Sequence, residues 1–182
     1  LCVPEQYGGL RADFETYCLV SEQLARGNAS TSLSYNMHAL TMMMMGGPIG
    51  SLGLSPEALE RHQELSAGRY QEVGERGVFY AQPHSEPVES GSADELGVGG
   101  RRFGTRARRV DGGYLVNGRK FFVSSAGAAD YYATPTLLDG DGPWESRTLY
   151  LAIPRDASGL ELSGEWDPLG MRSTVSRDLA LK

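Results

Sequence analysis

The residues best suited to chemistry lie in the stretch Val116 to Ser125, which reads VNGRKFFVSS. Within it, Phe121 and Phe122 lead directly into the hydroxyl groups of Ser124 and Ser125. An aromatic wall followed by hydroxyl groups at the end of a strand can hold a flat cofactor with a polar edge. The alternative is that the rings only fill a core, which is common for aromatic residues in strands. Because side chains alternate along a strand, we assign Phe122 to the ligand and leave its neighbour to the core.

A second polar segment, Gln82 to Gly100, is rich in Pro, Ser, Gly and acidic residues and follows a short apolar run. The backbone N–H groups of the Ser90-Gly91-Ser92 turn can form an anion-binding nest. We interpret Glu86, in a Ser-Glu-Pro turn, as a residue that orients this loop rather than as a catalytic acid. His84 is interpreted as structural or exposed rather than as a ligand to phosphate or substrate.

Helices are predicted in the first part of the chain. Asp13 is a candidate N-cap for a helix that stops at Gly27. Ser30 or Thr31 is predicted to cap a second helix, whose run from Thr41 to Met45 is apolar nearly all round and is expected to be deeply buried.

His38, on this second helix, is interpreted as a core histidine with satisfied hydrogen bonds. The methionines Met42 to Met45 more often fill a core than line a ligand tunnel, although methionine adapts well to flexible apolar ligands. Ser55-Pro56-Glu57 predicts the start of a third helix, which we expect to face inward as far as Gly68.

The character of the sequence changes after Gly77, where strand patterns replace helical ones. Asn117-Gly118 predicts a type I′ turn that begins the strand carrying the two phenylalanines. Other strands are predicted at 78–81, 103–110, 114–116, 131–137, 148–153, 160–162 and 177–181. Helices followed by an antiparallel meander indicate an α+β fold, a helical segment and then a barrel-like or sandwich-like β-domain. The predicted domains are 1–77 and 78–182.

Charge and composition restrict the function. The 182 residues include 17 Lys and Arg against 23 Asp and Glu, a formal net charge of −6. Nucleic acid is therefore excluded as a main partner, because its phosphates bind basic surfaces. We interpret the one arginine cluster as a solvated strand face, although it could meet a phosphate. Its members are Arg101, Arg102, Arg106, Arg108 and Arg109.

Cys2 and Cys18 are isolated and lack metal-ligand spacing, so we expect no metal and a reduced, cytoplasmic setting. The apolar run from Leu40 to Met45 is too short to span a bilayer. The chain begins at Leu1 rather than Met and stops in a strand-like run at Lys182. We therefore expect it to be a piece of a longer polypeptide.

Four motifs occur in a fixed order along the chain. They are Val3-Pro4-Glu5-Gln6-Tyr7-Gly8-Gly9, Ser85-Glu86-Pro87 with Ser90-Gly91-Ser92 behind it, Asn117-Gly118-Arg119-Lys120 running to Ser124, and Leu169-Gly170-Met171-Arg172-Ser173-Thr174. In these motifs the sequence resembles the flavin-dependent acyl-CoA dehydrogenase family, over nearly its whole length. The resemblance implies the last part of a helical N-terminal domain and most of a middle β-domain, without the family's C-terminal four-helix domain.

The resemblance also implies an FAD site. The family's Thr-Glu-Pro loop, which wraps the flavin and its pyrophosphate, corresponds to Gln82 to Ser92, with Gln82 in place of a tyrosine and Ser85 in place of the threonine. Phe122-Val123-Ser124 corresponds to a Trp-Ile-Thr that packs on the isoalloxazine and hydrogen-bonds near N5. The implied cofactor-binding residues are Gln82, Ser85, Gly91, Ser92, Phe122, Val123 and Ser124, and Ser92 is also implied in substrate binding. Arg172 is expected to serve a structural ion pair at least as often as a ligand contact.

The implied activity is oxidation of an acyl thioester, such as an acyl-CoA, at its α and β carbons. Because the family's base is usually a glutamate of the C-terminal domain, we name no catalytic residue and expect this piece to be inactive alone. Gln82, Phe122 and an extra loop residue depart from the family pattern and leave two alternatives open. One is a flavin monooxygenase or oxidase on the same scaffold, and the other is a non-catalytic scaffold. The implied partners are electron-transfer flavoprotein or oxygen as acceptor, and further copies of the chain in a homodimer or homotetramer.

Overall fold

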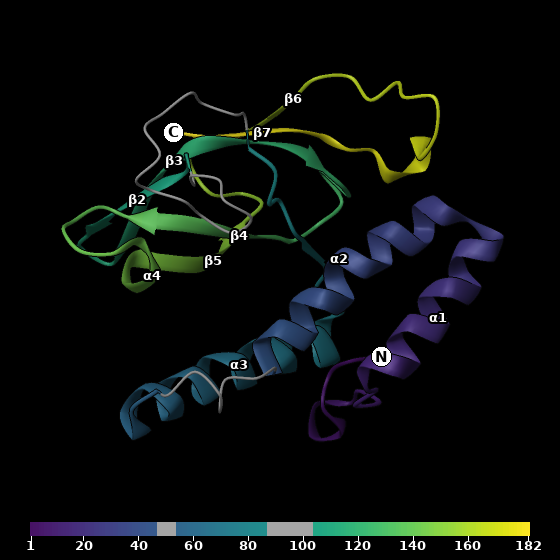
Figure 1. Cartoon of the computed structure of the whole chain (residues 1–182), viewed down its shortest axis with the longest axis horizontal. Helices are drawn as coiled ribbons and strands as arrows, with labels where there is room; N and C mark the ends of the chain where they lie inside the picture. Colours follow the sequence, from purple (N-terminus) through teal and green to yellow (C-terminus); the bar gives the residue numbers. More distant parts are fainter. Residues whose placement is uncertain (47–53, 87–103) are drawn as a thin grey trace. The chain divides into compact units, whose positions relative to one another are not determined.

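A computed structural model of the protein describes residues 1–46, 54–86 and 104–182. These residues form two compact units, Leu1–Tyr80 and Ala81–Lys182. The first unit is helical and the second holds most of a β-sheet (Figure 1). The predicted α+β class, with helices before strands, is therefore confirmed, and the predicted boundary at residue 77 lies close to the observed division.

The helical unit contains a short 3-10 turn, η1 (Glu5–Tyr7), and the helices α1 (Phe14–Gly27), α2 (Ala29–Gly46) and α3 (Pro56–Arg76). Two predicted caps are confirmed, because Asp13 accepts a hydrogen bond from the Thr16 backbone and Ser55 accepts one from Ala58. The predicted cap of α2 is wrong. Asn28 holds that position, with its side chain 3.0 Å from the Thr31 nitrogen, so α2 follows α1 almost directly.

Two other expectations for the helices need correction. α3 does not stop at Gly68 but continues to Arg76, where Gly77 ends it with a φ of 66°. A single glycine in a helix costs only about 1 kcal/mol, which packing on the same helix offsets. The methionine run of α2 is buried on one side only, since Met42 is buried whereas Met44 is 45% exposed.

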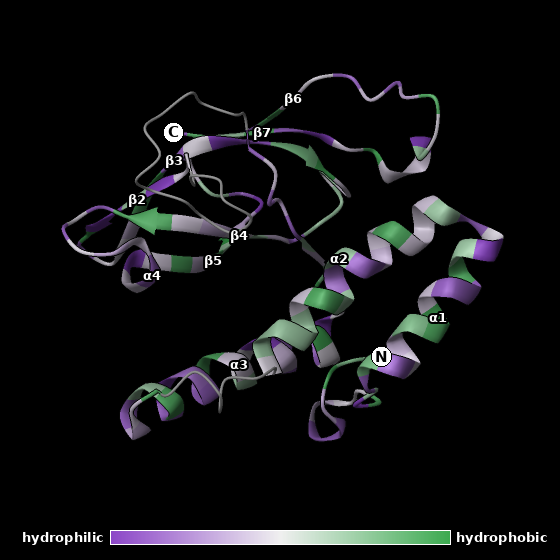
Figure 2. Ribbon diagram, viewed as in Figure 1, coloured by the Kyte–Doolittle hydropathy of each residue, from purple (hydrophilic) through white to green (hydrophobic). Residues whose placement is uncertain are grey.

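The first motif, Val3 to Gly9, packs within the helical unit. A Cβ on Gly9 would lie 1.9 Å from the Val3 carbonyl oxygen, and one on Gly74 of α3 would lie 2.0 Å from the Tyr7 carbonyl oxygen. Both glycines therefore permit close approach of backbone segments. Figure 2 shows hydrophobic and hydrophilic residues alternating along α1, as expected for a helix with one packed face.

The strands are β1 (Tyr80–Ala81), β2 (Arg106–Val110), β3 (Gly113–Val123), β4 (Tyr131–Leu138), β5 (Thr148–Pro154), β6 (Leu160–Ser163) and β7 (Arg177–Leu181), with two short helical turns, α4 (Trp144–Arg147) and η3 (Arg172–Thr174). They form one sheet in the order β1-β4-β2-β3-β7-β6, and β5 pairs with β4. The sheet is not wholly antiparallel as predicted, because β2 and β4 pair in parallel at Arg106 and Ala107. The central strand β4 is buried along nearly its whole length.

The predicted turn at Asn117-Gly118 is wrong. β3 runs without interruption from Gly113 to Val123, and the hairpin turn is formed by Asp111 and Gly112. Gly118 has a different role, since a Cβ there would lie 2.5 Å from the Thr105 hydroxyl oxygen and 2.7 Å from its Cα. The glycine is needed for close backbone approach inside a strand rather than for a positive φ.

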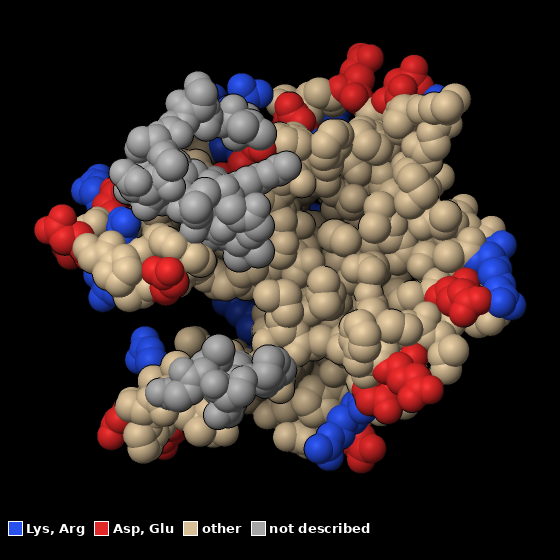
Figure 3. All heavy atoms as spheres, in the orientation of Figure 1, with Lys and Arg blue, Asp and Glu red and all other residues tan. Residues whose placement is uncertain are grey.

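Charged side chains lie at the surface with both signs interspersed on the face shown in Figure 3. This is the distribution expected of a solvated surface rather than of a nucleic-acid site. None of the helices within the described ranges is long and apolar enough to cross a membrane.

The role of Gly118 is testable by substitution. Gly118→Ala should lower the free energy of unfolding by about 1–3 kcal/mol, because the new methyl group overlaps Thr105. Gly113→Ala, on the same strand, is the control, since nothing lies within 4 Å of its Cβ position. Denaturant unfolding of both variants measures the difference, and equal stabilities would contradict the packing role.

Candidate functional site

The strand β3 contains an irregularity that exposes Phe122. The register of the β3–β7 ladder shifts between Lys120 and Val123, and Phe122 has a φ of 55°. Its ring is 62% exposed and makes edge-on contacts with Phe121 at 4.8 Å and Trp166 at 6.1 Å between centroids. A positive φ is strained for an aromatic residue and is typical of functional positions. The bulge thus presents a flat, accessible ring, and the contact of Phe122 with a cofactor stays a prediction.

A buried ion pair lies directly before the bulge. Lys120 is only 1% exposed, and its ammonium group donates to Glu86 Oε1 and to the Pro135 carbonyl oxygen at 3.0 Å. Burial lowers the pKa of Lys120, and the hydrogen bond and charge of Glu86 oppose that shift. Sequence reasoning missed this lysine, because its partner Glu86 is distant in the sequence and nothing near Lys120 indicates burial.

Glu86 is a structural residue, as predicted. Besides Lys120 it accepts hydrogen bonds from the Gly104 backbone and, at 2.6 Å, from the Thr105 hydroxyl group. Next to it, the Ser85 carbonyl oxygen accepts a hydrogen bond from the Phe121 nitrogen at 3.0 Å. These contacts fix the segment containing Ser85 against β3, so two of the predicted cofactor segments are adjacent in space.

A row of hydroxyl groups joins the end of β3 to the fourth motif. Ser124 Oγ lies 3.1 Å from Ser176 Oγ, which lies 2.8 Å from Thr174 Oγ1. The Ser125 nitrogen also donates to the Thr174 carbonyl oxygen at 2.8 Å. Ser176 was not predicted, because no local pattern links it to a strand more than fifty residues earlier.

The fourth motif is stabilised by contacts with residues close to it in the sequence. Arg172 pairs with Asp167 at 2.5 Å and donates to the Pro168 carbonyl oxygen at 3.1 Å. The Trp166 indole N–H donates to the Met171 carbonyl oxygen at 3.1 Å. The expected structural ion pair of Arg172 is therefore present, and the loop that carries Thr174 is held in place.

The remaining predicted site residues lie outside the bulge and the hydroxyl row, or have side chains that do not face a ligand. Gln82 is buried, and its amide donates to the Tyr150 hydroxyl group at 2.8 Å. His84 contacts the same hydroxyl at 2.9 Å, and burial followed by the charge of Lys120 lowers its pKa. The side chain of Val123 is buried, so only its backbone can face a ligand. Gly91 and Ser92 lie outside the described residues.

His38 has the predicted structural contact, although its side chain is only partly buried. Its Nδ1 accepts a hydrogen bond from the Tyr80 nitrogen at 3.2 Å, and burial lowers its pKa to about 4. Across the described ranges, no group of three or more His, Cys, Asp or Glu side chains is placed to hold a metal ion.

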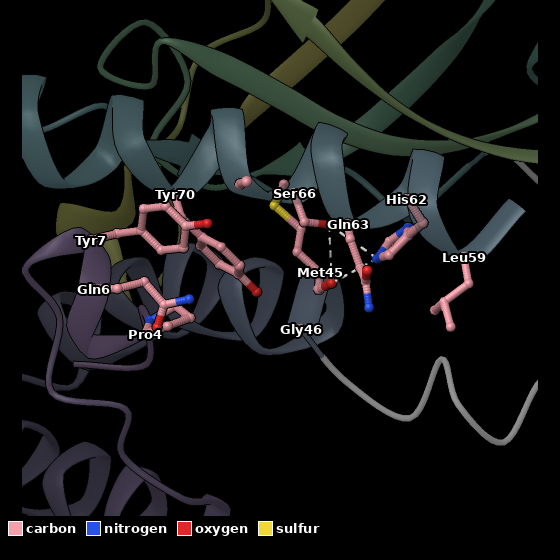
Figure 4. Close-up of a pocket in the computed structure, with 11 residues that line it drawn as sticks. Pro4, Gln6, Tyr7, Met45, Gly46, Leu59, His62, Gln63, Ser66 and Tyr70 are labelled. Atoms are coloured by element: carbon pink, nitrogen blue, oxygen red, sulfur yellow. Dashed lines mark hydrogen bonds between the residues drawn. The ribbon is translucent and has the colours of Figure 1, made fainter. Parts of the chain in front are cut away.

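The helical unit contains a hollow of about 500 Å³ (Figure 4). The Tyr7 and Tyr70 rings lie at one end, and at the other His62 Nε2 lies 2.8 Å from the Met45 carbonyl oxygen at the end of α2. None of the predicted cofactor residues lines this hollow.

Comparison with known proteins places the chain in a family. The acyl-CoA dehydrogenase middle domain matches residues 91–182, and the N-terminal domain of the same enzymes matches residues 1–53. The chain belongs to the acyl-CoA dehydrogenase family. It spans less than half the length of the curated relatives that it matches.

The relatives of this acyl-CoA dehydrogenase family member include two kinds of enzyme. An acyl-CoA dehydrogenase of Bacillus subtilis is 30% identical over 97% of the chain and 42% of the relative. A dibenzothiophene monooxygenase of Rhodococcus erythropolis is 29% identical over 97% of the chain and 37% of the relative. Both kinds therefore match nearly the whole chain at similar identity.

Solved structures share the fold. FMN-bound TdsC of Paenibacillus sp. A11-2 superposes with a TM-score of 0.75 at 24% identity, over 100% of the chain and 40% of TdsC. An FAD complex of an acyl-CoA dehydrogenase from Bacillus anthracis gives a TM-score of 0.70 at 19% identity, over 100% of the chain and 27% of that protein. The predicted family and fold are confirmed.

The buried ion pair yields a stability prediction. Lys120→Met should lower the free energy of unfolding by about 3–5 kcal/mol, because it leaves a buried carboxylate without its cation. Glu86→Gln should also destabilise, and the double variant should lose less than the sum of the two. Denaturant unfolding of the four proteins gives the coupling energy.

The control for this cycle is Lys182→Met, which removes an exposed pair with Glu161. Exposed pairs contribute less than about 1 kcal/mol. A Lys120→Met variant as stable as Lys182→Met would show that the buried pair does not hold the segment.

Proposed function

We propose that this chain is the flavin-holding part of an FAD-dependent, acyl-CoA dehydrogenase-like oxidoreductase that oxidises an acyl thioester at its α and β carbons. The observation that carries the proposal is the exposed Phe122 ring, held on a strained bulge between the Lys120 anchor and the hydroxyl group of Ser124. Membership of the family supports it further.

The residues present fit a flavin. Phe122 offers a flat apolar face for the isoalloxazine, and Ser124 offers a hydroxyl group for its edge near N5. The Ser85 backbone is bonded to Phe121, and we propose that its hydroxyl group contributes at the same edge. Gln82 fits less directly, because Tyr150 accepts one of the two N–H groups of its amide. Val123 would contribute backbone, and Gly91 and Ser92 remain proposed for the pyrophosphate and substrate.

A bound flavin supplies the sink for the two electrons that leave the acyl chain. The residues of this chain bind it, orient it and shield one face from water. We assign no general base among them, and the whole protein's activity needs groups beyond the part represented here. We propose FAD because the Bacillus anthracis dehydrogenase was solved with it, whereas TdsC was solved with FMN.

A flavin-dependent monooxygenase or oxidase is the second candidate. It is favoured by the similarity to dibenzothiophene monooxygenase and by Phe122 and Gln82, which depart from the dehydrogenase pattern. The electron acceptor would be oxygen in this case and an electron-transfer flavoprotein in the first. A homodimer or homotetramer, a role in fatty acid metabolism and a cytoplasmic location are proposed with either candidate.

Flavin binding is the first test. The purified protein should show flavin absorbance as isolated or after reconstitution, and Phe122→Ala should weaken binding about five- to tenfold through loss of an aromatic contact of about 1 kcal/mol. Phe14→Ala is the matched control, because Phe14 is also 62% exposed but lies on α1. Absence of flavin from the wild-type protein after reconstitution would overturn the proposal and favour a non-catalytic scaffold.

The reaction type has a separate test. A panel of acyl-CoA thioesters, added anaerobically, should bleach the flavin absorbance if the protein is a dehydrogenase, because electrons pass to the flavin without oxygen. Product that forms only with oxygen and a supplied reductant would instead establish the monooxygenase candidate.

A further inference from the structure

The three hydroxyl groups beyond the bulge are buried and arranged in a row. Ser124, Ser176 and Thr174 are each less than one-tenth exposed. At the inner end of the row, Thr174 Oγ1 lies 2.8 Å from the Met171 carbonyl oxygen. The row therefore runs from a backbone carbonyl at one end to Ser124, beside the exposed Phe122, at the other.

The direction of every hydrogen bond in this row follows from its inner end. A carbonyl oxygen can only accept, so the Thr174 hydroxyl group must use its single hydrogen on Met171. Ser176, 2.8 Å from Thr174, must then donate to it, because two oxygens at that distance need a hydrogen between them. Ser176 has then used its single hydrogen, so in the 3.1 Å hydrogen bond between Ser124 and Ser176 it is Ser124 that donates. The hydrogen of Ser124 is thus directed toward Ser176 and into the row.

We propose that this row makes Ser124 a hydrogen-bond acceptor toward its ligand, so that it selects an N–H group, and that Thr174 and Ser176 are the positioning residues that impose this direction. This inference rests on the proposed flavin site, with the hydroxyl of Ser124 near N5. The N5 atom carries a hydrogen only in reduced flavin and is an acceptor in oxidised flavin. Ser124 therefore binds reduced flavin more tightly than oxidised flavin.

The backbone supports this arrangement. The bond from the Ser125 nitrogen to the Thr174 carbonyl oxygen, at 2.8 Å, joins the two segments beside the row. Ser125 and Val175 both have positive φ, 64° and 46°. For the β-branched Val175 this conformation is strained and persists only where the surroundings impose it. The chain is thus held in an unfavourable conformation at the point where the hydroxyl groups meet.

The test is the redox dependence of flavin binding in the holoprotein. In Ser176→Ala the hydrogen of Ser124 is released and can turn to oxidised N5. The preference for reduced flavin should then fall about tenfold in the ratio of the two dissociation constants, for one hydrogen bond. For a two-electron couple this is a reduction potential lower by about 30 mV. The potential is read against a reference dye and needs no substrate turnover.

Three further variants separate an effect of hydrogen-bond direction on the potential from an effect of side-chain packing. Thr174→Val removes the inner anchor at nearly constant volume and should lower the potential in the same sense. Thr174→Ser keeps the hydroxyl group and should restore the wild-type value. Ser125→Ala is the matched control, because it removes a neighbouring hydroxyl group outside the row and should leave the potential unchanged.

The sign of the shift decides the outcome. A reduction potential that rises in Ser176→Ala would show that Ser124 donates to the flavin. An unchanged potential would show that Ser124 bonds a flavin atom whose protonation is the same in the oxidised and reduced states. Either result overturns the inference while leaving flavin binding intact. A wild-type protein that binds no flavin overturns the proposed function, and the inference with it. Thermal unfolding identifies variants that fail to fold, and Thr174→Val then replaces Ser176→Ala in the measurement.

Discussion

The ion pair between Lys120 and Glu86 is the constraint on which the site depends. Burying a charged ammonium group costs several kcal/mol unless acceptors surround it. Here the Glu86 carboxylate and the Pro135 carbonyl oxygen do so, while Thr105 occupies a further lone pair of the carboxylate. Four segments far apart in the sequence are thereby brought together at one point. The segment after β1 must lie against β3, because an unpaired charge on either side would be costly.

The position of Phe122 follows from this anchor. β3 is fixed at Lys120, and after the bulge it is fixed again where Ser125 donates to Thr174. Between these two points the ladder shifts register, and the extra residue has to project from the sheet. A strained φ at an exposed phenylalanine lowers stability, so it persists only because the flanking contacts over-determine the backbone. The accessible aromatic face of Phe122 is thus obtained at a cost in local stability.

The features predicted correctly from sequence are those that depend on neighbours along the chain. Asp13 and Ser55 cap helices through residues three positions away, and the strand predicted at 177–181 is β7. The failures depend on distant contacts. Gly118 was predicted to turn because Asn-Gly usually does, but Thr105 lies against it and keeps it in a strand. Lys120 carries no local signal of burial, since its partner Glu86 lies more than thirty residues earlier.

The orientation of the hydroxyl row shows why such a site cannot be inferred from residue types alone. A serine can donate or accept, and its identity at position 124 is compatible with either. The direction is decided at the other end of the row, where Met171 presents a backbone carbonyl that no side-chain substitution removes. Dehydrogenation and oxygenation both pass through reduced flavin, so an acceptor at Ser124 serves either candidate reaction. The direction of the Ser124 hydrogen is therefore the same whichever electron acceptor the protein uses.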